Sequence, residues 1–381
     1  MAGAREGLPR FFSISGMDPS LSALGESHRS VSDATRQRFL ALIRGETRGV
    51  TSGCARFGLR LASLPYGLAV SLRNRMFASA WKAVHRVAIP VVSVGNLTTG
   101  GTGKTPCVEY VASFYRRNDL RVAVLSRGYG SAGGRNDEAL VLEENLPDVP
   151  HLQGVDRVSL ARTAIEELES EVLVLDDGFQ HRRLARDLDL VLIDATEPWG
   201  YGYLLPRGLM REPKSSLRRA GLVVLTRCDQ VDGRRIEALR REISRYAPAA
   251  PVVETKHGPV ELVNSSRAVA TLDELRTRPV LAFCGIGNPE AFRRTLTDLG
   301  ADICAFRTYP DHHPYSRADV DSLRDWFREL PADGIAVTTQ KDLVKLRVDR
   351  LGDRALWSLR VRLQVLAGQR ELEDRLQGAV P

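Results

Sequence analysis

The sequence predicts an α/β fold in which a parallel sheet carries helices on both faces, followed by a second, smaller α/β domain. One observation is that short, continuously apolar segments alternate with amphipathic segments of helical spacing, as parallel strands buried on both faces require. The other is that residues 100–105 read GGTGKT shortly after the first apolar segment. A strand, a glycine-rich loop and a helix in this order make the predicted core P-loop NTPase-like.

The individual elements follow from the same pattern. The segments predicted to be strands are 89–94, 121–126, 172–175, 188–193, 222–226, 279–284 and 335–338. The segments predicted to be helices between them are 108–117, 159–168 and 289–299. Because the periodicity is weak between residues 254 and 277, we place the core domain at 56–277 and the C-terminal domain at 278–381.

Length, charge and cysteine usage limit the classes of function. The 381 residues suit two domains. With 54 basic and 47 acidic residues the net charge is +7, which favours anionic partners without choosing among nucleic acid, anionic lipid and phosphorylated metabolites. The five cysteines lie far apart and form no C-x-x-C pair, which argues against a zinc site or a disulfide framework and indicates a reducing compartment.

The N-terminal part of the chain has two different segments. Residues 1–55, rich in Ser, Gly, Arg and Ala, are expected to be a poorly ordered extension. A helix follows at 56–86, where basic residues flank an uncharged stretch of 12 residues (61–72) that contains Pro65. That stretch is too short to span a bilayer, which needs about 20 residues. The helix either lies in a membrane interface or packs on the protein's own core. Its apolar residues at helical spacing are Phe57, Leu61, Leu64, Leu68 and Leu72.

The GGTGKT motif departs from the usual phosphate-binding loop at one position. The consensus is G-x-x-x-x-G-K-[ST], and counting back from Gly103 puts Thr98 where the first glycine should stand. The context is otherwise right, since Pro106 suits the first turn of a helix. Lys104 is expected to reach the β- and γ-phosphates, and the Thr105 hydroxyl to bind Mg²⁺. The predicted nucleotide-binding residues are Thr98, Thr99, Gly100, Gly101, Thr102, Gly103, Lys104 and Thr105.

A second element of a phosphate site follows at residues 172–177, which read VLVLDD. A buried strand that ends in carboxylates is typical of a Walker B element, which holds Mg²⁺. The sequence does not decide which of Asp176 and Asp177 binds the metal. Gln180 and His181 come directly after this acid pair and add polar groups beside it.

Several motifs together resemble the tetraacyldisaccharide 4'-kinase family. In chain order they are GNLTTGGTGKTP, LSRGYG (125–130), LDDGFQHRRLARDLDLVLIDA (175–195), LLPRGLMREP (204–213), TRCD (226–229), FCGIGNPEAF (283–292), YPDHHPYS (309–316) and TTQKD (338–342). The resemblance covers residues 56 to about 350. It implies a kinase that uses ATP and Mg²⁺ to phosphorylate the 4'-hydroxyl of a lipid A disaccharide 1-phosphate precursor.

The resemblance also implies partners and a location. The partners are the glycolipid and an anionic membrane surface, with no nucleic acid. The location is the cytoplasmic face of the bacterial inner membrane, with peripheral attachment. For the helix at 56–86, this favours the interface interpretation over packing on the core.

By position, the resemblance implies roles for further residues. Asp137 and His312 are expected to form the catalytic pair, with His313 as the alternative histidine, and Lys104 and Asp177 to act beside them. Thr105, Asp176 and Glu212 are expected to lie at the metal. The predicted substrate-pocket residues are Arg127, Tyr129, Gln180, His181 and Arg211. The sequence departs from the family at 136–139, where the usual GDEP reads NDEA, and at 206–213, where PRGLMREP replaces PAGPLREP.

Two other classes of function remain open from the sequence. A deviant-P-loop ATPase switch also has a GGxGKT loop and a basic membrane helix, but such proteins typically read Lys-Gly-Gly where this chain has Thr99. A GTP-using metallochaperone is suggested by TRCD (226–229), which resembles a guanine-reading T-K-x-D motif with arginine in the lysine position.

Overall fold

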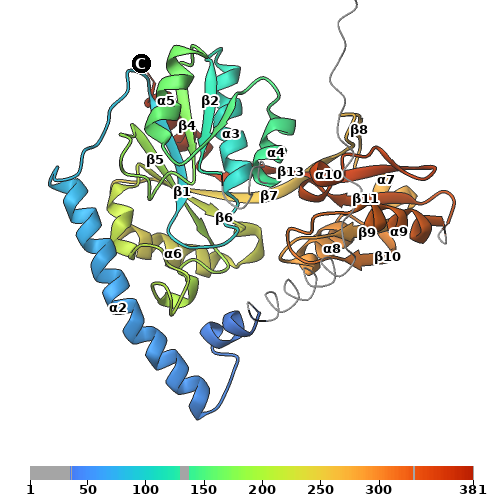
Figure 1. The fold of residues 1–381 in the computed structure, drawn as a ribbon, viewed down its shortest axis with the longest axis horizontal. Helices are drawn as coiled ribbons and strands as arrows, with labels where there is room; N and C mark the ends of the chain where they lie inside the picture. Colours follow the sequence, from blue (N-terminus) through green and yellow to red (C-terminus); the bar gives the residue numbers. More distant parts are fainter. Residues whose placement is uncertain (1–34, 36, 129–136, 329–330, 381) are drawn as a thin grey trace, which may run out of the picture. The chain divides into compact units, whose positions relative to one another are not determined.

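The computed structural model describes residues 35, 37–128, 137–328 and 331–380, and it is shown in Figure 1. The chain divides into two compact units, residues 1–56 and 57–381. In the first unit, a helical segment ends at residue 44, and the Arg56 guanidinium donates to the Thr47 carbonyl at 2.8 Å. Tyr129, one of the predicted substrate residues, lies outside the described residues.

The second unit is built on one sheet with the strand order β10-β9-β11-β13-β7-β6-β5-β1-β4-β2-β3. One end of this sheet consists of parallel strands: β1 (Val91–Asn96), β2 (Val122–Ser126), β3 (His151–Gln153), β4 (Val172–Asp176), β5 (Leu188–Asp194) and β6 (Leu222–Thr226). The other end consists of β9 (Pro279–Cys284), β10 (Asp302–Thr308) and β11 (Ile335–Thr339), also parallel.

Two long strands, β7 (Val252–Val263) and β13 (Arg354–Ala367), join these groups. They pair with each other antiparallel, while β7 runs parallel to β6 and β13 parallel to β11. Figure 1 shows this pair running between the two groups of strands. Two short strands pair antiparallel with this pair: β8 (Val269–Ala270) with β7, and β12 (Arg350–Leu351) with β13.

Helices cover both faces of the sheet. Val92 and Val94 of β1 share a hydrophobic cluster with α3, whereas Val91 packs in the cluster under α5. This alternation follows from the pleat, which points successive side chains to opposite faces. The helices after the first strand are α3 (Lys104–Arg117), α4 (Asp137–Asn145), α5 (Arg157–Glu166), α6 (Gly233–Ser244), α7 (Glu274–Thr277), α8 (Pro289–Asp298), α9 (Arg317–Arg328), α10 (Gln340–Leu346) and α11 (Gln369–Gln377). The predicted fold class is confirmed.

The seven predicted strands correspond to β1, β2, β4, β5, β6, β9 and β11. The sequence did not predict β7, β10 or β13, and the stretch 254–277 described as weakly periodic contains most of β7. The reason is burial: β1 is buried at every position, whereas β7 and β13 mix buried and half-buried positions and carry many polar residues. The predicted boundary at residue 278 falls between α7 and β9, within one compact unit. The division of 56–381 into two domains stays a prediction.

The predicted N-terminal helix is present as α2 (Val50–Ala78), with Pro65 inside it. Its apolar residues at helical spacing are all exposed, with exposed fractions from 50% to 72%; we call them the outer stripe: Phe57, Leu61, Leu64, Leu68 and Leu72. The interpretation in which this stripe packs on the protein's own core is therefore wrong. The buried residues of α2 are Ser63, Val70 and Asn74, which lie on another side of the helix. Among the residues that the structure describes, every helix is too short or too polar to traverse a bilayer.

Candidate active site

The glycine-rich loop between β1 and α3 has the geometry of a phosphate-binding loop. Gly103 caps α3 with φ 84°, a left-handed conformation that favours glycine. A Cβ at Gly103 would lie 2.1 Å from the His257 ring, so a larger residue here would displace that ring. Lys104 and Thr105 then form the first turn of α3, where unpaired backbone N–H groups and the helix dipole favour an anion.

Neighbouring segments hold this loop in place. Asn96 donates to the Thr102 hydroxyl at 2.9 Å, and the Thr226 hydroxyl donates to the Thr102 carbonyl at 3.1 Å. Arg227 donates to the Gly101 carbonyl at 2.7 Å and pairs with Asp194. The first two residues of the TRCD motif therefore support the phosphate loop, which gives them a role other than reading a guanine base.

Thr98, which stands in place of the first consensus glycine, is itself held by backbone contacts. It forms an isolated antiparallel bridge with Met210, and the neighbouring Thr99 amide donates to the Leu209 carbonyl at 2.7 Å. Thr98 is buried. The path of the chain at this position is therefore fixed by the segment around Met210 rather than by a glycine.

The two acids at the end of β4 have different surroundings. Asp177 accepts two hydrogen bonds from the Arg211 guanidinium, both at 2.8 Å, and Lys104 Nζ lies 3.8 Å from its Oδ1. Burial raises the pKa of Asp177, but the Arg211 hydrogen bonds and the Lys104 charge outweigh it and lower the pKa to about 2. For the buried Asp176, burial first and the charge of Glu138 second raise the pKa to about 6.

Asp176 has the properties of a Mg²⁺ ligand. Its Oδ1 is buried and has no hydrogen-bond partner, and carboxylate and hydroxyl oxygens are the donors that Mg²⁺ prefers. Thr105 supplies a hydroxyl in the first turn of α3. Burial, and then the Asp176 charge, raise the pKa of the Cys107 thiol on the same helix, which places α3 close to Asp176. The described residues include no group of three or more His, Cys, Asp or Glu that could hold a metal. An ion here would therefore depend on phosphate oxygens as well, as Mg²⁺ sites in kinases do.

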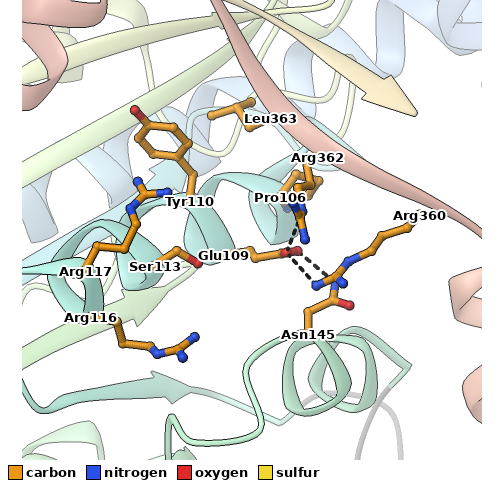
Figure 2. A pocket seen from close by; sticks show the side chains of 10 residues that line it. All are labelled: Pro106, Glu109, Tyr110, Ser113, Arg116, Arg117, Asn145, Arg360, Arg362 and Leu363. Atoms are coloured by element: carbon orange, nitrogen blue, oxygen red, sulfur yellow. Dashed lines mark hydrogen bonds and ion pairs between the residues drawn. The ribbon is translucent and has the colours of Figure 1, made fainter. Parts of the chain in front are cut away.

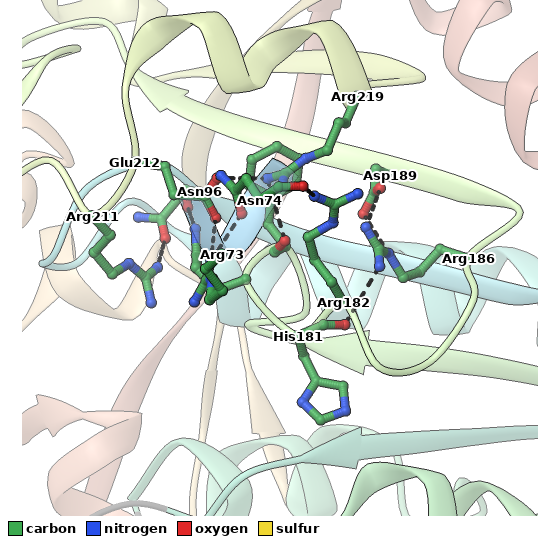
Figure 3. Close-up of polar contacts among 12 residues, drawn as sticks. Arg73, Asn74, Asn96, His181, Arg182, Arg186, Asp189, Arg211, Glu212 and Arg219 are labelled. Atoms are coloured by element: carbon green, nitrogen blue, oxygen red, sulfur yellow. Dashed lines mark hydrogen bonds and ion pairs between the residues drawn. The ribbon is translucent and has the colours of Figure 1, made fainter. Parts of the chain in front are cut away.

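Glu212 was expected at the metal, and the structure gives it another position. Its carboxylate is fully buried and accepts hydrogen bonds from three side chains: Asn74 at 2.8 Å, Arg219 at 2.9 Å and Arg73 at 3.2 Å. Figure 3 shows these polar contacts. Because two guanidinium groups already neutralise this charge, we assign Glu212 to a buried ion-pair cluster and not to the metal.

Asp137 and His312 are in direct contact. Asp137 is the first residue of α4, and its Oδ2 lies 2.9 Å from Nδ1 of His312, in the loop after β10. The hydrogen bond to Asp137 raises the pKa of His312 above its ordinary value, with burial opposing it. Burial raises the pKa of Asp137, but the His312 hydrogen bond and the Lys345 charge outweigh it and lower the pKa. Lys345 Nζ lies 3.2 Å from the same carboxylate oxygen.

His313, the alternative histidine, packs elsewhere. Its ring stacks on Tyr309 with 4.8 Å between ring centroids, and its Nε2 lies 3.2 Å from Asp319. Tyr315 contacts the same ring edge-on. The structure thus gives His313 a packing position and brings His312, not His313, to Asp137.

Sequence reasoning missed four charged residues in this region. Glu138 pairs with Lys341 at 3.0 Å, and charge effects connect it to Asp176 and Lys104. Lys345 bridges Asp137 and the buried Asp342. The NDEA and TTQKD motifs contain Glu138, Lys341 and Asp342, and Lys345 follows three positions later, but only the packing of α4 near α10 gives them a common location.

The predicted substrate residues are placed as follows. Gln180 donates to the Asn96 carbonyl at 3.0 Å, so it lies at the end of β1. Burial, followed by the charge of Arg157, lowers the pKa of His181 to about 4 and keeps its ring neutral at pH 7. Arg211 binds Asp177, and Arg127 is exposed just after β2. A direct contact of any of them with substrate stays a prediction.

A cavity of 330 Å³ lies between α3, the end of α4 and β13, and Figure 2 shows its lining. Three of its four arginines have acidic partners: Arg360 and Arg362 pair with Glu109 and Glu261, and Arg116 pairs with Asp148. We therefore do not place the nucleotide in this cavity.

Comparisons with known proteins agree with this geometry. Residues 55–381 match the family model described as tetraacyldisaccharide-1-P 4'-kinase. The chain is 42% identical over 341 residues to the tetraacyldisaccharide 4'-kinase of Anaeromyxobacter sp. (strain Fw109-5), covering 84% of this chain and 91% of the relative. It is 42% identical over 354 residues to that of Anaeromyxobacter dehalogenans (strain 2CP-C), covering 87% and 92%. A crystal structure of the "apo" form of LpxK from Aquifex aeolicus in complex with ATP is similar with a TM-score of 0.71 and 30% identity, covering 86% of this chain and 100% of that one.

Proposed function

This chain belongs to the tetraacyldisaccharide 4'-kinase family, and from that premise we infer that it transfers the γ-phosphate of ATP to the 4'-hydroxyl of a lipid A disaccharide 1-phosphate precursor. The observation that carries the site assignment is that the phosphate loop, with Lys104, and the acid pair Asp176 and Asp177 lie at the same edge of the sheet. Family membership sets aside the ATPase switch and the GTP-using metallochaperone.

The chain's own groups would hold the nucleotide in three ways. The N-terminus of α3 presents backbone N–H groups to the phosphates, and Lys104 supplies a positive charge beside them. Thr105 and Asp176 would hold Mg²⁺, because the free oxygen of Asp176 is buried and lacks a partner. When bound, Mg²⁺ neutralises charge on the β- and γ-phosphate oxygens. Arg211 fixes Asp177 and keeps it ionised next to Lys104.

Proton removal from the sugar hydroxyl is assigned to His312. Its Nδ1 is engaged by Asp137, which leaves Nε2 as the nitrogen that accepts a proton. Asp137 fixes the orientation of the ring and stabilises its charged form, as a carboxylate does for a catalytic histidine. Lys345, which lies in α10, forms an ion pair with the Asp137 carboxylate.

We further propose that the protein attaches peripherally to the cytoplasmic face of the bacterial inner membrane, where its glycolipid substrate lies. The support is the outer stripe of α2, whose five apolar side chains are exposed. An exposed apolar patch of this kind is typical of an interaction surface. Arg60 and Arg75, exposed on the same helix, would add attraction to anionic lipid, about 1 kcal/mol for each basic residue near the surface.

The test is phosphate transfer by the purified full chain. The protein is incubated with γ-labelled ATP, Mg²⁺ and a disaccharide 1-phosphate lipid in mixed micelles, and the lipid fraction is separated and counted. We expect labelled lipid from the wild type and none above background from Lys104→Ala. ATP hydrolysis without any labelled lipid would contradict the proposal.

A further inference from the structure

One segment of the chain, residues 204–212, lies between helix α2 and the phosphate loop. On the α2 side, the Ser63 hydroxyl donates to the Leu204 carbonyl at 3.0 Å, and the Tyr66 hydroxyl donates to the Arg211 carbonyl at 3.0 Å. The Arg207 amide donates back to the Ser63 oxygen at 3.2 Å. The segment is therefore fastened to the buried side of α2 at both of its ends.

The same segment is fastened to the phosphate loop by its backbone. The Thr99 amide donates to the Leu209 carbonyl at 2.7 Å, and the Arg211 amide donates to the Leu97 carbonyl at 2.6 Å. These bonds hold the strand end and the first residues of the loop. A displacement of residues 204–212 would thus move both the loop and α2.

The side chains of Arg211 and Glu212 also connect α2 to the phosphate site. Arg211 grips Asp177 with two hydrogen bonds, while the next side chain, Glu212, is bound by Arg73 and Asn74 of α2. The peptide bond between them accepts the Tyr66 hydrogen bond. One residue therefore contacts the nucleotide site, and its neighbour contacts the helix.

The burial of Glu212 makes this connection stiff. A carboxylate with no exposed surface costs much free energy unless its partners remain in place. Arg219, which is itself mostly buried, also depends on Glu212 for its counter-charge. Glu212 and the residues that bind it are therefore expected to move together with α2.

We propose that Tyr66, Asn74 and Glu212 are positioning residues that couple the position of α2 to the Arg211–Asp177 contact, and through it to nucleotide binding. The inference rests on the proposed function, because it takes α2 to attach to a membrane and Asp177 to face the nucleotide. Burial of the outer stripe in a bilayer fixes α2 from one side, and the inner contacts pass that constraint to Arg211. Binding to a membrane and binding of nucleotide then strengthen each other, as linkage requires.

The test measures the affinity of the full chain for a fluorescent ATP analogue, with Mg²⁺ and without any lipid acceptor. This affinity is measured in the absence of vesicles and in the presence of vesicles of phosphatidylethanolamine and phosphatidylglycerol. For wild type, we expect vesicles to tighten nucleotide binding. Tyr66→Phe removes one hydroxyl and keeps the ring, so it should fold and should weaken nucleotide binding roughly two- to tenfold, the effect of one lost hydrogen bond. Asn74→Ala should also abolish the tightening by vesicles.

Ser71→Ala is the matched control, because Ser71 is exposed on the same helix and should leave nucleotide affinity as in wild type. Thermal unfolding of each variant shows whether it is folded. Wild-type nucleotide affinity in both Tyr66→Phe and Asn74→Ala, with and without vesicles, would overturn the inference. The assay contains no acceptor, so a failure of lipid phosphorylation leaves this result intact. A failure of vesicle binding removes the membrane proposal alone, because the vesicle-free comparison still tests the link from Tyr66 to Arg211.

Discussion

Nδ1 of His312 lies 2.9 Å from Oδ2 of Asp137, although 175 residues separate the two in the sequence. Asp137 begins α4, beside the parallel strands that carry the phosphate loop, and His312 follows β10 at the far edge of the sheet. The long β7–β13 pair joins these two parts of the fold. The proposed base for the sugar hydroxyl is therefore a pair whose residues come from both ends of one sheet.

If this pair acts as a unit, its two residues should be non-additive on mutation. Asp137→Ala and His312→Ala should each lower kcat by roughly 10²–10⁴, the usual contribution of general acid–base catalysis. The double variant should lose little more than the worse single variant. Steady-state kinetics with saturating ATP and lipid gives these values, and binding of an ATP analogue should persist in all three. Fully multiplicative losses would contradict the pairing.

The pH dependence follows from the pKa of His312. A base must be deprotonated, and the hydrogen bond to Asp137 raises this pKa above its ordinary value of about 6.5. We therefore expect kcat to fall as the pH drops through a value above about 6.5. Asp137→Asn removes the largest cause of the rise and leaves the smaller effect of the Asp311 charge, so the acidic limb of its residual activity should move to lower pH. An unchanged limb in Asp137→Asn would exclude His312 as the titrating group.

The assignment of Asp176 to the metal predicts a proton-linked Mg²⁺ affinity. Burial and the Glu138 charge raise the pKa of Asp176 to about 6, so below that pH a proton competes with the ion. Mg²⁺ affinity of the ATP-bound protein should rise as pH increases through about 6, measured by Mg²⁺ titration at several pH values. Asp176→Asn should bind Mg²⁺ weakly at every pH. Glu212→Gln serves as the comparison, and a folded Glu212→Gln protein that keeps wild-type nucleotide affinity but loses Mg²⁺ binding would restore that residue as the ligand.

Lys104→Ala should lower kcat by about 10²–10³, because a fixed positive charge beside the transferring phosphoryl group is lost. Lys104 lies 3.8 Å from Asp177, and after its removal Arg211 still pairs with that carboxylate, with Arg157 nearby. The Lys104 side chain is partly exposed, so we expect Lys104→Ala to fold and to unfold at nearly the wild-type temperature. Near-normal turnover in a folded Lys104→Ala protein would rule out the phosphate-loop assignment.

Substitutions in the outer stripe of α2 should weaken membrane binding without lowering the stability of the folded protein. Leu64 and Leu68 are 66% and 72% exposed, so changing both to serine removes little buried surface from the folded protein. Each exposed leucine contributes on the order of 1.5–3 kcal/mol if a bilayer buries it fully. The double variant should therefore partition to anionic vesicles at least tenfold more weakly in a sedimentation assay, with an unchanged unfolding temperature. Equal partitioning would show that another surface binds the membrane.

The fold was predictable where burial leaves a simple pattern. β1, β4, β5 and β6 are buried along their whole length, and such strands read as continuous apolar runs. By contrast, β13 (Arg354–Ala367) is half-buried at many positions and includes four arginine and glutamine residues that interrupt any such run. Its role as a connector depends on pairing with β7, which no local pattern records.

The site was predictable where a motif carries its own chemistry. In the GKT loop and the VLVLDD segment, the residues predicted to bind phosphate and metal are adjacent in the sequence, so a short motif is enough to predict them. Glu138 and Lys345, in contrast, gain their roles only because α4 and α10 bring distant charges together. The buried position of Glu212 was not predictable for the same reason, since its partners Arg73 and Asn74 come from a helix more than 130 positions away.

The most direct test of the central claim is the position of the phosphate in the product. The purified chain is incubated with ATP, Mg²⁺ and a disaccharide 1-phosphate lipid, and the product is examined by phosphorus–proton correlation NMR. We predict one new phosphate, coupled to the proton at carbon 4 of the second sugar, and no such signal with Lys104→Ala. A phosphate at any other position, or ATP consumption with the lipid unchanged, would contradict the account.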